Sequence, residues 1–147
     1  MKNILLIVSI LFLTSVTTLS AQEWTTNFEE ATTQASKEHK NILLVFSGSD
    51  WCAPCIKLEK SIFQSEAFKT FASYNYILVR ADFPKRKKNK LSKAQQEQNN
   101  ELAASYNQNG YFPLVLLLDA KGTVLGKTGY KKTSPKEYIS LLQSFEK

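Results

Sequence analysis

Cysteine and histidine are scarce in this chain of 147 residues: it has two cysteines, Cys52 and Cys55, and one histidine, His39. A closed structural zinc site needs four ligands, usually supplied by two Cys or His pairs. A zinc site within one chain is therefore not expected. Covalent haem attachment needs a histidine directly after the second cysteine, and Ile56 stands there. The sequence predicts neither a metal nor an organic cofactor.

Glycine and proline are also rare, with five and four residues. Long flexible linkers are therefore not expected, and the chain length suits one ordinary domain rather than two. The hydrophobic share of 43%, with nine Phe, six Tyr and two Trp, is typical of a globular protein and not of a disordered one. We expect a single domain that acts as a monomer.

The chain also lacks an apolar run long enough to cross a membrane comfortably, which takes about 20 residues. The run from Ile4 to Leu13 is shorter, follows the positive charge of Lys2, and precedes a Leu19-Ser20-Ala21 stretch that can serve as a cleavage site. The alternative is an uncleaved helix. We expect residues 1–21 to be a signal peptide cleaved near Ala21, residues 22–147 to form the mature domain, and the protein to be periplasmic or secreted.

Apolar runs of strand length alternate with helical patterns in the mature part. Strands are predicted over 42–46, 76–82, 112–118 and 123–128, and helices over 25–40, after Cys55 as far as 73, over 94–107, and from Pro135 with Ser134 as N-cap. Alternation of strands with helices implies parallel pairing, and the last two strands form a hairpin. The predicted fold class is α/β, with a central mixed sheet of four to five strands flanked by helices.

The cysteines are three positions apart, between a predicted buried strand and a helix. As a structural staple, so short a loop would contribute only about 2 kcal/mol, against roughly 3 kcal/mol for a fifteen-residue loop. A redox pair suits the position better, because the first sulfur lies at a helix N-terminus, where free N–H groups and the helix dipole stabilise a thiolate. Since only the thiolate attacks, Cys52 is the predicted nucleophile and Cys55 the resolving thiol.

The stretch Trp51-Cys52-Ala53-Pro54-Cys55 resembles the active-site motif of the thioredoxin superfamily. Thioredoxins also place a cis-proline loop against the disulfide, and Phe112-Pro113 stands at that place in the order of elements, although an ordinary trans proline is the alternative. The resemblance covers nearly all of 22–147. The segment from Leu58 to Phe63 is similar to exported thioredoxin-like proteins and to periplasmic thiol:disulfide interchange domains.

The resemblance implies a thioredoxin-like fold and exchange with protein thiols and disulfides, through a mixed disulfide on Cys52 and a Cys52–Cys55 redox disulfide. It implies that Trp51, Pro54, Phe112 and Pro113 support the site or bind substrate, and that a membrane-embedded disulfide reductase is the electron donor. Proline directly before the second cysteine and the absence of a histidine between them favour a reductant. The alternatives are a disulfide isomerase or oxidase, and a binding module without enzymatic activity.

Four features lie outside this pattern. Phe46 stands where thioredoxins carry a buried Asp that moves protons at the second cysteine, and Leu114 stands where they have Thr. Asp50 is expected in an exposed loop, where it would slightly disfavour a Cys52 thiolate. The basic stretch from Lys85 to Lys93 is interpreted as a solvated insertion or as a docking patch for acidic proteins; nucleic acid is not an expected partner, because no aromatic residues are interleaved there.

Overall fold

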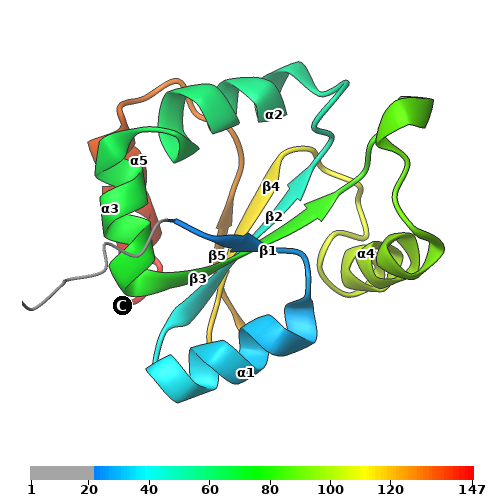
Figure 1. The fold of residues 1–147 in the computed structure, drawn as a ribbon. Helices are drawn as coiled ribbons and strands as arrows, with labels where there is room; N and C mark the ends of the chain where they lie inside the picture. The colour runs from blue at the N-terminus through cyan, green and yellow to red at the C-terminus, as the bar shows by residue number, and fades with distance from the viewer. Residues whose placement is uncertain (1–21) are drawn as a thin grey trace, which may run out of the picture.

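Five strands in the order β1-β3-β2-β4-β5 form one sheet at the centre of the structure, a computed structural model that describes residues 22–147 (Figure 1). The predicted signal peptide lies outside the described residues. The strands are β1 (Trp24–Thr25), β2 (Asn41–Ser47), β3 (Tyr76–Asp82), β4 (Leu114–Leu118) and β5 (Val124–Thr128). The prediction of a mixed sheet of four to five strands is confirmed.

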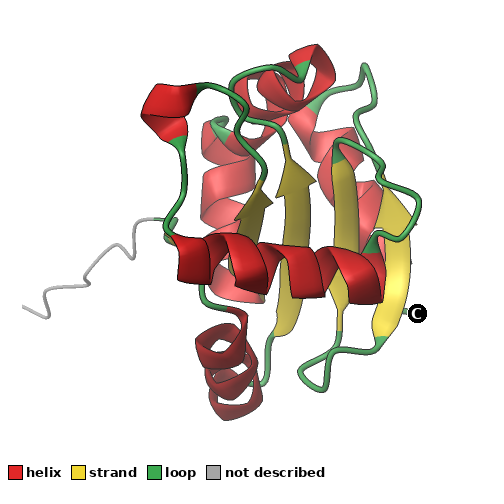
Figure 2. Ribbon diagram, turned by 90° about the vertical axis from the view of Figure 1, so that its right-hand side faces the viewer, coloured by secondary structure: helices red, strands yellow, loops and turns green. Residues whose placement is uncertain are grey.

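Helices cover both faces of this sheet, as the view turned by 90° shows in front of and behind the strands (Figure 2). They are α1 (Phe28–Glu38), α2 (Ala53–Leu58), α3 (Glu66–Asn75), α4 (Lys93–Tyr106) and α5 (Pro135–Ser144), with a π-helical turn η1 (Glu59–Phe63) and a 3-10 turn η2 (Lys87–Asn89). Between residues 22 and 147, none of them is both long and apolar enough to span a bilayer.

The two faces of the sheet carry two separate cores, because side chains alternate along each strand. Leu58, Phe63 and Tyr138 pack with one face, beneath α2, η1, α3 and α5. Ala31 of α1 and Leu102 of α4 pack with the other face of the sheet. Burying a large apolar side chain contributes about 1.5–3 kcal/mol, so both cores hold the sheet between its helices.

The pairing of the strands brings three chain segments to one edge of the sheet. Strand β2 is parallel to β3 and antiparallel to β4, and Phe46 is paired with both Ala81 and Leu114. The residues after β2, those after β3 and those before β4 therefore meet at the same edge. This edge, which we call the redox edge, carries the Cys pair on the segment after β2 and Pro113 directly before β4.

Two predicted starts are wrong. The strand expected from residue 112 begins at Leu114, after the Phe112–Pro113 bond. The helix expected from residue 25 begins at Phe28, because the Asn27 side chain accepts a hydrogen bond from the Glu30 N–H and caps it there. Trp24 is instead part of β1, paired with Leu78 on the parallel neighbour β3. A two-residue strand has too little pattern of its own to be predicted from sequence.

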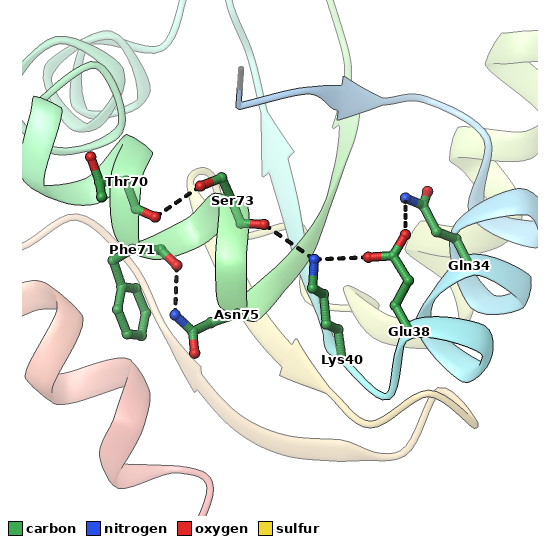
Figure 3. A network of polar contacts seen from close by, with 7 residues as sticks. All are labelled: Gln34, Glu38, Lys40, Thr70, Phe71, Ser73 and Asn75. Carbon is green, nitrogen blue, oxygen red and sulfur yellow. Dashed lines mark hydrogen bonds and ion pairs between the residues drawn. The ribbon is translucent and has the colours of Figure 1, made fainter. Parts of the chain in front are cut away.

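The opposite edge of the sheet is closed by a polar network around Lys40 (Figure 3). The Lys40 ammonium lies 2.8 Å from the Glu38 carboxylate and donates to the Ser73 carbonyl at 3.1 Å. Hydrogen bonds from Lys40 and from Gln34 hold the pKa of Glu38 below its usual value. The network joins the end of α1 to the end of α3, away from the redox edge.

Candidate active site

Cys52 and Cys55 are joined by a disulfide with an S–S length of 2.10 Å and a Cα–Cα distance of 5.2 Å. Cys52 is the N-cap residue of α2, and its sulfur accepts a hydrogen bond from the Cys55 N–H at 3.3 Å. Both residues are 4% exposed. The predicted arrangement, with the first sulfur at a helix N-terminus and the second one turn inside, is confirmed.

The loop that leads into α2 is fixed to the end of β3. The Ser49 N–H donates to Asp82 at 2.9 Å, and the Ser49 hydroxyl donates to the same carboxylate. The Trp51 indole N–H donates to the Phe83 carbonyl at 2.7 Å. Gly48 lies directly against the Trp51 ring, and a Cβ at this position would overlap the indole.

Trp51 and Phe112, both predicted site residues, are brought together at the redox edge. Their ring centroids are 5.5 Å apart in an edge-to-face arrangement, and Phe83 contacts Phe112 at the same distance. Trp51 keeps 39% of its surface exposed although it is held by the Phe112 ring and by its hydrogen bond to the Phe83 carbonyl. Phe83 was missed by sequence reasoning; its place directly after a strand that ends at the redox edge is the signal that could have found it.

Pro113 is buried, and the Phe112–Pro113 peptide bond is cis, as the resemblance implied. Pro113 and Pro54 line one groove of about 570 Å³, together with Tyr111 and Tyr130. All six predicted site residues therefore lie at the redox edge, and the two tyrosines are additions to them. This groove is large enough to receive side chains that flank a cysteine in a peptide.

A smaller pocket of about 140 Å³ lies on the other side of Cys55 and is also lined by Glu59 and Arg80. The Glu59 carboxylate accepts a hydrogen bond from the Arg80 guanidinium at 2.6 Å, and Arg80 lies 4.3 Å from the Trp24 ring centre. Glu59 is thus partly buried in the wall of this pocket. Its place four residues after Cys55 puts both on one face of the helix, which is the signal that was available.

Phe46 is fully buried in the core on the α1 and α4 face, as its apolar character requires. The position that holds an Asp in thioredoxins therefore supplies no carboxylate to the cysteines here. Within the part of the chain that the structure describes, Glu59 is the carboxylate-bearing residue that lines the Cys55 pocket.

Asp50, in the loop before α2, is bound to the start of the basic stretch. Its carboxylate accepts hydrogen bonds from the Lys85 N–H at 2.9 Å, the Arg86 N–H at 3.0 Å and the Asn89 side chain at 2.8 Å. These bonds, that from Lys85 first, lower the pKa of Asp50. The Lys85 ammonium in turn lies 3.8 Å from the Trp51 ring centre. The start of the basic stretch is therefore attached to the active-site loop.

No cluster of three or more His, Cys, Asp or Glu residues able to hold a metal ion occurs between residues 22 and 147. The site offers two sulfurs, one nearby carboxylate and an aromatic surface. This combination suits thiol–disulfide exchange, in which a thiolate attacks one sulfur of a disulfide and displaces the other.

Comparisons with known proteins agree with this geometry. The family model described as thioredoxin-like matches residues 23–120. The disulfide bond reductase DsbH of Chlamydia pneumoniae is 38% identical over 118 residues, which cover 80% of this chain and 69% of DsbH. The thioredoxin-related protein DsbJ of the same organism is 27% identical over 93 residues, which cover 58% of this chain and 27% of DsbJ.

Solved structures give the same assignment. A DsbH oxidoreductase superposes with a TM-score of 0.79 at 35% identity, covering 86% of this chain and 85% of that one. A disulphide isomerase from Xylella fastidiosa Temecula1, with a TM-score of 0.61 at 20% identity, covers 82% of this chain and 88% of its own and shares the fold. The chain therefore belongs to the thioredoxin-like family, as a thiol–disulfide oxidoreductase.

Proposed function

We propose that this protein reduces disulfides of other proteins outside the cytoplasm, with Cys52 as nucleophile and Cys55 as resolving thiol. The observation that carries the proposal is the position of Cys52 as N-cap of α2, with its sulfur accepting the Cys55 N–H. The same N–H and the helix dipole favour a thiolate on Cys52 once the disulfide is reduced. Cys55 lies inside the helix and has no such N-terminal position.

The reaction has two exchange steps. The Cys52 thiolate attacks a substrate disulfide, forms a mixed disulfide and releases the first substrate thiolate. The Cys55 thiolate then attacks the Cys52 sulfur, releases the second substrate thiolate and leaves the Cys52–Cys55 disulfide seen here. Two electrons pass from the protein to the substrate, and a further dithiol, for which we propose a membrane-embedded disulfide reductase, must return them.

Cys55 has to lose its proton before the second step. Glu59 is the candidate acceptor, because its side chain and that of Cys55 line the same small pocket. The ion pair with Arg80 keeps the carboxylate beside this pocket. Glu59 would thus accept the Cys55 proton, which the apolar side chain of Phe46 cannot do.

Direction and location rest on three further observations. Ala53 and Pro54 supply no histidine that would stabilise the Cys52 thiolate, and a less stabilised reduced form is a stronger reductant. DsbH, which is 38% identical to this chain, carries the name of a disulfide bond reductase. The charged start and apolar run of residues 1–21 support export.

Reduction of insulin with dithiothreitol as electron source tests the proposed activity. The wild type should accelerate the precipitation of reduced insulin, Cys52→Ser should abolish the acceleration, and Cys55→Ser should accumulate mixed disulfides with the substrate. The matched cysteine variants separate the two roles. A pure binding module would show no turnover that depends on either cysteine, and mixed disulfides on Cys52→Ser instead would reverse the assignment.

A further inference from the structure

We propose that the cations of residues 85–90 form a docking surface that selects disulfides flanked by acidic residues in protein substrates. The inference rests on the proposed function, since it concerns the substrates of that same redox pair. The residues of this surface, called the basic segment below, are Lys85, Arg86, Lys87, Lys88 and Lys90.

The basic segment is held in place beside the disulfide. Asp50, two residues before Cys52, accepts the N–H groups of Lys85 and Arg86 and the side-chain amide of Asn89. Residues 87–89 form the turn η2, which follows β3 at the redox edge of the sheet (Figure 1). A solvated insertion without a role would need no such attachment to the active-site loop.

The positive charge of this segment is left for a partner. Lys85 to Lys90 are all exposed, and the ion pairs found between residues 22 and 147 involve none of these cations. No acidic residue occurs between Phe83 and Gln96. The adjacent carboxylate of Asp50 binds backbone and amide N–H groups, and the charge of Arg86 also contributes to its lowered pKa. The lysine ammonium groups remain available for carboxylates from outside.

Lys85 connects this charge to the surface that any substrate must touch. Its ammonium lies over the face of Trp51, and Trp51 is the exposed residue that directly precedes the nucleophile. A substrate whose cysteine reaches Cys52 has one flank near Trp51 and the basic segment. Its other side can use the groove of Tyr111, Pro113 and Tyr130. The charge thus acts within the footprint of the substrate and not on a remote face.

An anionic membrane is the competing partner for such a surface. A bilayer that covers the basic segment would also cover Trp51 and the disulfide, and so would block the approach of a folded protein substrate. Acidic side chains beside a disulfide satisfy the cations and present the sulfur in one encounter. The arrangement therefore favours a protein partner.

The test uses two peptides of equal length, each closed by one disulfide, with four Glu around the cysteines in one and four Gln in the other. The second-order rate constant for their reduction by the reduced wild type is measured in stopped flow. At 0.01 M ionic strength the Glu peptide should react about tenfold faster, the low end of electrostatic steering. At 1 M the preference should vanish, because the screening length falls from about 30 Å to about 3 Å.

The variant Lys87→Gln, Lys88→Gln, Lys90→Gln removes three charges whose side chains take no part in holding the segment. It should reduce the tenfold preference to about twofold. The control Lys37→Gln, Lys121→Gln, Lys147→Gln removes the same charge from exposed residues at the end of α1, in the β4–β5 turn and at the C-terminus, away from the redox edge. It should keep the preference.

Each outcome decides the inference. Equal reduction of both peptides by the wild type would overturn the docking surface and leave the reductase intact, whereas reduction of neither would overturn the proposed function itself. A preference that both triple variants lower equally would show a general charge effect and overturn it too. A further outcome would assign the surface to a membrane instead of a substrate. In that case the wild type would co-sediment with phosphatidylglycerol vesicles, and the Lys87, Lys88 and Lys90 variant would lose this binding but keep the preference for the Glu peptide.

Discussion

Gly48 shows how one missing side chain positions the residue next to the nucleophile. The Trp51 ring lies where a Cβ of residue 48 would be, and its N–H reaches the Phe83 carbonyl from that position. The sequence shows a glycine in a loop but does not show that an aromatic ring lies against it. The close approach depends on the end of β3, which is distant in the chain.

Gly48→Ala should therefore destabilise the protein by about 1–3 kcal/mol, the usual cost of overpacking, and should displace the indole. Denaturant unfolding of the oxidised protein measures the change. In a Trp51→Ala background the same substitution should be neutral or slightly stabilising, because the obstacle is gone and alanine restricts the unfolded chain. An equal destabilisation in both backgrounds would contradict the assigned contact.

Glu59 is the second residue at which the structure adds to the sequence. Glu59→Gln should slow the resolution of the mixed disulfide by about 100-fold, the low end of general base catalysis. The decay of a mixed disulfide with a small aromatic thiol, followed at 412 nm, measures this step. The defect should shrink as the pH rises, because hydroxide then removes the Cys55 proton.

Glu66→Gln, which removes an exposed carboxylate from the start of α3, is the matched control and should resolve at the wild-type rate. Two results would assign Glu59 a structural role through its pair with Arg80. One is a Glu59→Gln defect of the same size at every pH, and the other is a defect fully explained by a smaller fraction of folded protein.

Among the elements, those with a strong local signal were predictable and those that depend on distant partners were not. Strand β3 was predicted with its observed bounds because its apolar run is bounded by polar residues. Strand β1 was not, since only its pairing with β3 defines it. The attachment of the basic segment to Asp50 also joins residues far apart in the chain, and no periodicity could reveal it.

The final helix begins with a capping box that could be predicted only in part from the sequence. Ser134 and Pro135 were predicted at its start, and the structure adds Glu137, whose carboxylate accepts from the Thr133 hydroxyl and from the Ser134 N–H and hydroxyl. These bonds, that from Thr133 first, lower the pKa of Glu137 from 4.5 to about 2. The ionised form is thus the one that stabilises the folded helix.

Because the pKa is lower in the folded than in the unfolded protein, this stabilisation is complete above pH 4.5 and is lost as the pH falls towards about 2. The melting temperature of Glu137→Gln should lie below that of the wild type above pH 4.5, and the difference should narrow at lower pH. Glu101→Gln, on an exposed part of α4, serves as control. A gap that stays constant down to pH 2 would contradict the capping role.

For the whole molecule, the topology explains why site residues so far apart in the chain were predictable. One motif and one proline implied a fold that brings three strand ends to the redox edge, and the structure places all six predicted residues there. The surroundings of the site were less accessible to sequence analysis. Contacts with distant elements hold Glu59 and the basic segment beside the cysteines, and a linear pattern does not contain such contacts.

Export is the prediction that concerns the chain as a whole. If residues 1–21 are a signal peptide, the mature protein recovered from a bacterial periplasm should begin at Gln22 or within about two residues of it. N-terminal sequencing of the exported protein measures this. Replacing Ile4 to Leu13 with polar residues is the control and should retain the precursor in the cytoplasm. Full-length protein found there from the unaltered gene would count against export.

The claim that this oxidoreductase is a reductant is tested most directly by its redox potential. The claim follows from the absence of a histidine between the cysteines. Asp50 is bound to the basic segment, and this contact does not change the argument from the missing histidine. Equilibration of the Trp24→Phe variant with glutathione buffers, read by the fluorescence of Trp51, gives the value. We predict a potential near that of thioredoxin, about −270 mV. A potential above about −180 mV, the level of protein disulfide isomerase, would contradict the account and indicate an oxidase or isomerase.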